Sequence, residues 1–246
     1  MSQITLDGFD LTKVSRNIPL LIIGDALQVM NQFPHESIDM IHDDAGYNDL
    51  QEHREVGTTT RLKVSEGSNN AFYEDNVDYN KTIPIYRNLL KKGRHLYIWR
   101  PSLNEKSLHN WCLLIQPEVG LLSKNSFRFR KAIVCKKSYP GMGYSFRSEQ
   151  ERIIVADNVE TEEIFFAYKK GQMRQLQLKS LKDIFIDKWK HPRSPEKIHT
   201  SEKPLSIVTK LIKTSSYPDE IVLEPFAGSF QTGIANVKSS LNRKVI

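Results

Sequence analysis

The sequence predicts an α/β fold: a doubly wound, mainly parallel and twisted sheet with helices on both faces and an antiparallel hairpin at one edge. Short apolar runs alternate along the chain with stretches whose apolar residues recur at helical spacing, as in strand-helix units. Two of these runs end in acidic or small residues, where ligands sit in such sheets. Two later strand-like runs flank a turn rich in Gly and Pro at 139–143, which favours antiparallel pairing.

The amino-terminal third predicts two strands, a short helix and a long loop. The apolar run 19–23 is followed by Gly-Asp, which indicates a buried strand that opens into a helix at 26–30. Residues 37–42 form the next predicted strand. Residues 48–77 are polar and show no sustained periodicity, so they predict a surface loop, and loops of this length are usually functional or disordered.

The central part predicts two further strand-helix units. Apolar residues recur at helical spacing over 79–90, and Gly93 is expected to stop this helix before a strand at 94–99. A second helix is expected at 103–115.

The remaining elements complete the sheet. Strands are expected at 127–135 and 153–156, on either side of the Gly-Pro turn. Residues 168–199 are basic and irregular and are the best candidate for an inserted recognition segment. A helix is then expected over 204–216, followed by a buried strand that ends at Glu224.

Composition bounds the class of protein. The chain has 246 residues and 39% hydrophobic content, enough for one sizeable core, so we predict a single domain over 1–246 with recognition loops at 48–77 and 168–199. Its two cysteines exclude a disulfide framework and a metal site built from cysteine, and both are expected to be buried thiols in a reducing compartment. The sequence shows no leader and no apolar run near the roughly 18 residues of a membrane span, which favours a soluble, cytoplasmic protein without a membrane partner.

The formal net charge is +6, and basic residues cluster in one stretch without acids. They are Lys124, Arg128, Arg130, Lys131, Lys136 and Lys137. Such a patch binds phosphate backbones through counterion release, which points to a polyanionic partner. On charge alone, a solvated strand face explains the cluster equally well.

Two motifs carry the functional prediction. Asp44-Ala45-Gly46-Tyr47 follows the strand at 37–42, and a second motif runs from Glu224 through Pro225, Phe226, Ala227, Gly228 and Ser229 to Phe230. A His-x-x-x-Lys-Pro segment at 199–204 precedes the second motif. In this order, the segments resemble the DNA amino-methyltransferases of permuted type, whose catalytic motif precedes the cofactor motif. The resemblance implies a Rossmann-like methyltransferase fold, S-adenosylmethionine as cofactor and double-stranded DNA as substrate.

The resemblance also assigns the catalytic residues. Asp44 and the carbonyl of Ala45 would grip an exocyclic amine, and Tyr47 would stack on a base that has left the helix. Family members usually read Asp-Pro-Pro-Tyr here. Ala45 and Gly46 leave the turn more flexible, at an ordering cost on the order of 1 kcal/mol per residue. The competing interpretation is a turn that bears a solvated aspartate.

The cofactor residues are assigned in the same way. Backbone N–H groups in the second motif would lie beside the cofactor, where small residues allow close approach. The residues implied are Asp25 and Ala26 near the adenine, Lys203, Glu224 and Asp44 near the methionine end, and Phe226, Gly228 and Ser229 in the turn. For Asp25, Ala26, Lys203 and Glu224 taken singly, a helix cap or a surface charge is the commoner explanation, and it is their spacing in one pattern that favours the cofactor role. Phe230 stands where the family has glycine, and its side chain could occupy cofactor space or start a helix as an ordinary hydrophobe.

The nucleic-acid contacts are expected on two segments. Residues 141–147 resemble the family segment that lines the target-base pocket, where Tyr144 or Phe146 would stack on the base and Arg147 would meet a phosphate. Lys131, Lys136 and Lys137 would contact the DNA backbone. A hairpin turn with an exposed aromatic residue is the alternative for 141–147.

The preferred function is methylation of adenine N6 in DNA, because an aspartate begins the catalytic tetrapeptide. The alternative is a catalytically silent homologue that binds DNA or partners an active methyltransferase subunit. Ala45-Gly46, Phe230 and the end of the sequence at Ile246, where family members continue into an acid that anchors the ribose, favour this alternative. Methylation of RNA or protein is a weaker rival, and a homodimer is a further expectation.

Overall fold

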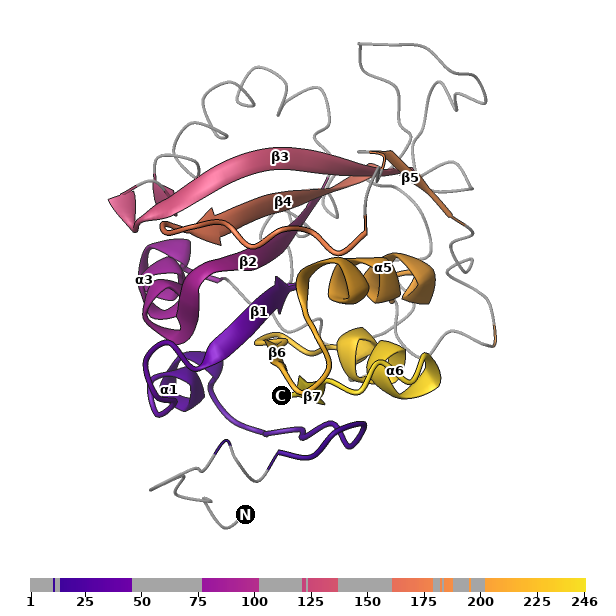
Figure 1. Ribbon diagram of the computed structural model, residues 1–246, viewed down its shortest axis with the longest axis horizontal. Helices are drawn as coiled ribbons and strands as arrows, with labels where there is room; N and C mark the ends of the chain where they lie inside the picture. Colours follow the sequence, from indigo (N-terminus) through magenta and orange to yellow (C-terminus); the bar gives the residue numbers. More distant parts are fainter. Residues whose placement is uncertain are drawn as a thin grey trace, which may run out of the picture.

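The computed structural model describes residues 11, 14–45, 77–101, 121–122, 124–136, 161–178, 182, 184–187, 195 and 202–246. Within these residues, seven strands form one sheet in the order β5-β3-β4-β2-β1-β6-β7 (Figure 1). β4 runs antiparallel to both of its neighbours, and the other pairs are parallel. The predicted α/β fold with a mainly parallel sheet is confirmed.

The elements have the following bounds. The strands are β1 (Ile38–Asp43), β2 (Leu90–Pro101), β3 (Phe127–Lys136), β4 (Thr161–Lys169), β5 (Ile184–Ile186), β6 (Ile221–Leu223) and β7 (Lys244–Val245). The helices are α1 (Ala26–Met30), α3 (Tyr79–Leu89), α5 (Leu205–Ser215) and α6 (Gln231–Lys238). None of the helices in this described part of the chain combines the length and the apolar character of a membrane span.

Side chains alternate along each strand and so reach both faces of the sheet, and helices bury both faces. On one face, Met40 and Tyr97 pack with α5 and α6 in a cluster that also holds Phe166 and Val222. On the other face, Ile41 and Leu96 pack with α1 and α3. The register agrees with this division, since residues that pair across strands appear in the same cluster. Figure 1 shows the two pairs of helices on opposite sides of the sheet.

The predicted strand at 19–23 is wrong. This segment runs beside the edge strand β7, where the N–H of Leu20 donates to Val245 O at 2.9 Å, but it forms no ladder. Leu21 is 58% exposed and Ile23 94% exposed. An apolar run predicts burial only if neighbours cover both faces, and at this edge they do not. The helix expected at 26–30 is confirmed.

Gly93 has a different role from the one predicted. Helix α3 ends at Leu89, and Leu90 already starts β2. Gly93 has φ 74° and lies where the pairing with β1 shifts register, as in a β-bulge. A Cβ on Gly93 would lie 1.9 Å from the carbonyl oxygen of Gln172, so this glycine permits another chain segment to cross closely.

The antiparallel pairing also has a different partner. β3 pairs with Thr161–Lys169, and the predicted strand at 153–156 lies outside the described residues. The expectation that 168–199 is irregular throughout is wrong, because Tyr168 and Lys169 complete β4 and Ile184–Ile186 forms β5. These strands were missed because their apolar residues run without alternation.

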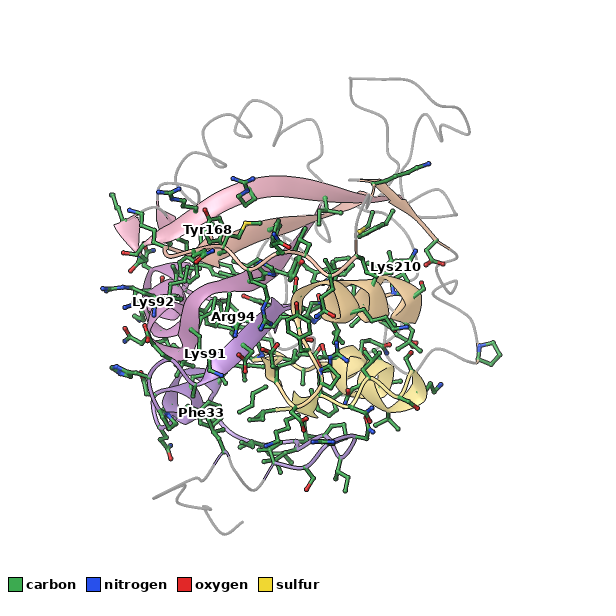
Figure 2. All side chains as sticks on the ribbon, viewed as in Figure 1. Phe33, Lys91, Lys92, Arg94, Tyr168 and Lys210 are labelled. Atoms are coloured by element: carbon green, nitrogen blue, oxygen red, sulfur yellow. The ribbon has the colours of Figure 1, made fainter. Side chains whose placement is uncertain are left out.

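Acidic residues near the amino-terminal ends of β1 and β6 pair with basic residues of β2 and of the segment that follows β4. Asp39 accepts two hydrogen bonds from Lys91 Nζ at 2.9 Å and lies 3.3 Å from Arg94 Nε. Glu220 pairs with Arg174 and with Arg94. Lys91 and Arg94 lie along the first half of β2, away from the arrowhead of β1 (Figure 2). This network stabilises the edge of the sheet opposite to the predicted site.

Candidate functional site

The carboxyl ends of β1, β2 and β6 bring the predicted site together. Asp43 pairs with Ile98 across β1 and β2, so Asp44 follows beside Trp99. Ile41 pairs with Leu223 across β1 and β6, so Glu224 follows at the same edge. Because adjacent parallel strands end at one edge of a sheet, two motifs that lie far apart in the sequence become neighbours.

Asp44 forms a salt bridge with Lys203 of the 199–204 segment. Lys203 Nζ lies 2.7 Å from Asp44 Oδ1, and the two side chains are 2% and 16% exposed. The same ammonium lies 5.4 Å from the centre of the Trp99 ring, within range of a cation–π interaction. Lys203 directly precedes Pro204, the N-cap of α5, so the start of this helix positions the ammonium. The structure thus brings together Asp44 and Lys203, two of the residues named in the sequence analysis.

A buried histidine links the strands of the site to α6. Trp99 Nε1 donates to His42 Nε2 at 2.7 Å. An indole N–H can only donate, so the ring proton of His42 is on Nδ1, which donates to Thr232 Oγ1 at 2.8 Å. Sequence analysis missed His42, Trp99 and Thr232. A histidine inside the strand predicted at 37–42 was the available signal.

Glu224 ends β6 as a buried carboxyl group. Its Oε1 lies 3.5 Å from His42 Nδ1, while its Oε2 makes no hydrogen bond to any residue in the described ranges. Burial raises the pKa of Glu224, and the nearby charge of Asp44 acts in the same direction. A buried acceptor without a donor is costly, so a donor from a ligand would be stabilised here.

The turn after Glu224 contains two residues with positive φ. Gly228 has φ 47°, and a Cβ on it would meet no atom of the described residues within 4 Å, so among these residues the space above it is open. Phe230 has φ 53° and ψ 46° and is the N-cap of α6. Its ring lies against Gly233, where a Cβ would be 2.5 Å from a ring carbon, and it also packs on the apolar cluster beneath α5 and α6. Phe230 therefore contributes its side chain to the helix and the core. Ser229 accepts a hydrogen bond from Gln231 Nε2 at 3.3 Å, and Phe226 is half-buried.

The left-handed backbone at Phe230 leads to a stability prediction. Residues other than glycine lose about 1–2 kcal/mol in this conformation. Phe230→Gly and Phe230→Ala both remove the ring from Gly233, but only glycine relieves the backbone. We expect the free energy of unfolding of the Gly variant to exceed that of the Ala variant by about 1 kcal/mol, measured by urea denaturation. An Ala variant as stable as the Gly variant would contradict a strained turn.

Asp43 is a second buried acid that sequence analysis missed. Its Oδ2 accepts a hydrogen bond from the hydroxyl group of Tyr86 at 2.9 Å, and its Oδ1 accepts one from the N–H of Ala45 at 3.0 Å. Burial raises the pKa of Asp43 to about 6, against the opposing effect of these hydrogen bonds. Ala45 is itself buried, so both ends of this hydrogen bond lie inside the protein.

Other predicted residues are separate from this cluster or lie outside the described residues. Asp25 caps α1 through the N–H of Gln28 at 2.8 Å, and Ala26 begins that helix. A role for either at the cofactor stays a prediction. Lys131 and Lys136 lie on β3, with Lys136 at its carboxyl end and hence at the same edge of the sheet as Asp44. The residues outside the described ranges are Gly46, Tyr47, Lys137, Tyr144, Phe146 and Arg147. Of the two cysteines, Cys135 is a buried free thiol as predicted, and Cys112 is outside the described ranges.

Sequence comparisons point to DNA methyltransferases. Residues 38–246 match the family model described as DNA methylase. The chain is 25% identical over 260 residues to the DNA adenine methyltransferase YhdJ of Escherichia coli strain K12, across 94% of this chain and 79% of that protein. It is 28% identical over 232 residues to the Type II methyltransferase M2.MboI of Moraxella bovis, across 87% of this chain and 77% of that protein.

Solved structures share the fold. The cytosine-N4-specific PvuII DNA methyltransferase superposes with a TM-score of 0.60 at 16% identity, over 95% of this chain and 84% of that chain. The M1.HpyAVI-SAM complex superposes with a TM-score of 0.57 at 21% identity, over 93% of this chain and 91% of that chain. Since the family match extends from β1 to the last residue, Ile246, this chain belongs to the DNA methylase family.

Proposed function

We propose that this protein is a site-specific DNA methyltransferase that transfers a methyl group from S-adenosylmethionine to the exocyclic amine of a flipped base, with adenine N6 as its target. The observation that carries the proposal is the meeting of Asp44, Lys203 and Glu224 at one edge of the sheet. The relatives named above support DNA as the substrate, and the SAM complex among the structural neighbours supports the cofactor.

The residues at this edge fit S-adenosylmethionine. Glu224 Oε2 is buried and has no hydrogen-bond partner in the described part of the chain, so it suits the amino group at the methionine end. Open space above Gly228 allows a ligand to approach the backbone of the turn, and the ring of Phe230 is turned onto Gly233. When bound, the cofactor would supply an electrophilic methyl group on a sulfonium ion.

The chain's own residues would activate the amine. The lone pair of an exocyclic amine is delocalised into the ring, which makes the nitrogen a weak nucleophile. The Asp44 carboxylate and the Ala45 carbonyl would each accept a hydrogen bond from one N–H group of the amine, which would localise the lone pair on nitrogen. Lys203 holds the Asp44 carboxylate at 2.7 Å and limits its orientations. Tyr47 would stack on the base and offset part of the few kcal/mol of unstacking.

Adenine is preferred to cytosine on two grounds. The catalytic tetrapeptide begins with an aspartate at Asp44, and one relative is an adenine methyltransferase by name. A cytosine-N4 enzyme also shares the fold, so the choice of base needs a direct product measurement.

Nucleoside analysis tests the proposal. The protein would be incubated with methyl-labelled S-adenosylmethionine and long unmethylated duplex DNA of mixed sequence, which offers most short recognition sites. After digestion to nucleosides, we expect the label in N6-methyldeoxyadenosine. Label in N4-methyldeoxycytidine would overturn the base preference. Cofactor binding and DNA binding without label would instead support the silent homologue, which the Ala45-Gly46 turn favours.

The basic residues at 131, 136 and 137 lead to a DNA-binding prediction. Replacing Lys131, Lys136 and Lys137 together with glutamine should weaken DNA binding and flatten its salt dependence by about one unit of slope per lost phosphate contact. A matched control removes three exposed lysines elsewhere, Lys170, Lys213 and Lys238. Fluorescence anisotropy at salt concentrations from about 50 to 300 mM would measure both slopes, because the screening of charges changes strongly over this range. Equal slopes for the two triple variants would show that Lys131, Lys136 and Lys137 are solvated and make no phosphate contacts.

A further inference from the structure

Asp43 lies between the site and the core, and both of its carboxylate oxygens are engaged. Oδ1 accepts the N–H of Ala45 at 3.0 Å, and Oδ2 accepts the hydroxyl group of Tyr86 at 2.9 Å. Asp43 and Tyr86 are each 0% exposed. Tyr86 comes from α3, which packs on the face of the sheet opposite to α5, where Lys203 holds Asp44. The two adjacent acids are therefore held from different faces.

The bond from Asp43 to Ala45 closes a turn around Asp44. A side-chain oxygen that accepts the N–H two residues later forms an Asx turn, which fixes the backbone between the two residues. The residue enclosed is Asp44, and the residue whose N–H is held also supplies the Ala45 carbonyl. Both acceptors proposed for the target amine are thus attached to backbone that Asp43 controls.

The buried N–H of Ala45 makes this contact necessary. Proline at this position would lack the donor and would fix φ by its ring. Alanine does neither, and a buried N–H without an acceptor costs as much as a lost hydrogen bond. Asp43 supplies that acceptor, and the hydroxyl groups of Tyr86 and Tyr79, both from α3, help to orient the carboxylate.

We propose that Asp43 is a positioning residue for methyl transfer: its carboxylate, oriented by Tyr86, clamps the Ala45 amide and thereby aims the Asp44 carboxylate and the Ala45 carbonyl at the target amine. This role rests on the proposed function. It adds a residue that touches neither substrate nor cofactor but acts through the backbone of the catalytic turn.

The electrostatics of the site support the role. Burial raises the pKa of Asp43 to about 6, so the folded state binds this proton more tightly than the unfolded chain. The contribution to stability is therefore complete below the unfolded pKa of 3.8 and is lost as pH rises through about 6. At pH 8, the ionised carboxylate destabilises the fold while it strengthens the bond to Ala45, since charged acceptors bind N–H more strongly. Stability and activity should consequently respond in opposite directions to Asp43→Asn.

Three variants test the clamp at pH 8 with labelled cofactor and duplex DNA. Asp43→Ala removes the acceptor and should lower kcat by about 10–100-fold, as small misplacements of reacting groups do, with KM changed less than about threefold. Asp43→Asn keeps an acceptor oxygen and should give an intermediate kcat with a higher Tm than the wild type. Tyr86→Phe leaves Asp43 in place but removes one of the two tyrosine hydroxyl groups that orient it, so its kcat should also be intermediate.

A proline background separates the clamp from general stabilisation. In Ala45→Pro, the amide donor is absent, so adding Asp43→Ala should change kcat by less than about threefold. A residue with a merely structural role would lower kcat equally in both backgrounds and would lower Tm in step with activity. In the wild type, the Ala45 amide signal in a ¹⁵N correlation spectrum should titrate with a midpoint near pH 6 and should lose this titration in Asp43→Ala.

The two failures are distinguishable. A wild-type rate retained by Asp43→Ala, or an Ala45 amide that does not titrate with Asp43, would overturn the positioning role alone. Absence of methyl transfer by the wild-type protein would overturn the proposed function and, with it, this role.

Discussion

Replacing Asp44 with asparagine is expected to lower the rate of methyl transfer by about 10²–10⁴-fold, the usual range for a side chain that handles a proton in the reaction. Asparagine keeps the size of the side chain and an oxygen within reach of Lys203, so the fold and the helix start at Pro204 should be unaffected. The variant loses the negative charge of the carboxylate, which attracts both the N–H group of the target amine and the Lys203 ammonium. The affinity for S-adenosylmethionine should change less than about threefold.

Single-turnover transfer and a calorimetric titration of each protein would separate the two effects. Asp219→Asn is the matched control, because Asp219 pairs with Arg16 at the opposite edge of the sheet and should keep the wild-type rate. Transfer by Asp44→Asn within tenfold of the control would remove Asp44 from the chemistry.

Lys203→Met should have the largest effect on stability. The ammonium is 2% exposed and its partner carboxylate 16%, so loss of the lysine removes a 2.7 Å ion pair from a largely buried carboxylate. Breaking a buried ion pair costs about 3–5 kcal/mol, and the partial exposure of Asp44 places this case at about 2–3 kcal/mol. The double variant Lys203→Met with Asp44→Asn removes both charges and should recover most of that loss.

Urea denaturation of the wild type, both single variants and the double variant at pH 7.5 gives the coupling energy. Lys213→Met, an exposed change on the same helix, is the control and should stay within about 0.5 kcal/mol of the wild type. A coupling energy below about 0.5 kcal/mol would show that the salt bridge between Asp44 and Lys203 has no energetic weight.

Much of the fold was predictable because apolar periodicity reports burial. The strands β1 and β6 and the helices α3 and α5 lie within a few residues of their predicted ranges. The run at 19–23 misled because periodicity cannot report which strands form the edge of a sheet, and this segment lies outside β7. Gly93 was misassigned because a glycine between a helix and a strand fits a helix stop and a bulge equally well.

The site was predictable only where parallel order determines proximity. Asp44 and Glu224 follow adjacent strands, so their meeting follows from the topology. The hydrogen bonds from Trp99 to His42 and from Tyr86 to Asp43 depend on strand register and helix docking, which no local pattern in the sequence specifies. In the sequence, these hydrogen bonds are indicated by no more than the polar residues His42 and Asp43 at the end of a predicted strand.

The central claim is that the ends of β1 and β6 form a working cofactor site, and calorimetric titration of S-adenosylmethionine into the full chain tests it most directly. Micromolar binding is predicted, with Glu224→Gln weakening the affinity because Glu224 Oε2 is the buried acceptor without a partner among the described residues. Absence of detectable heat in the wild-type protein would contradict the claim. Equal affinity in wild type and Glu224→Gln would remove Glu224 from the site.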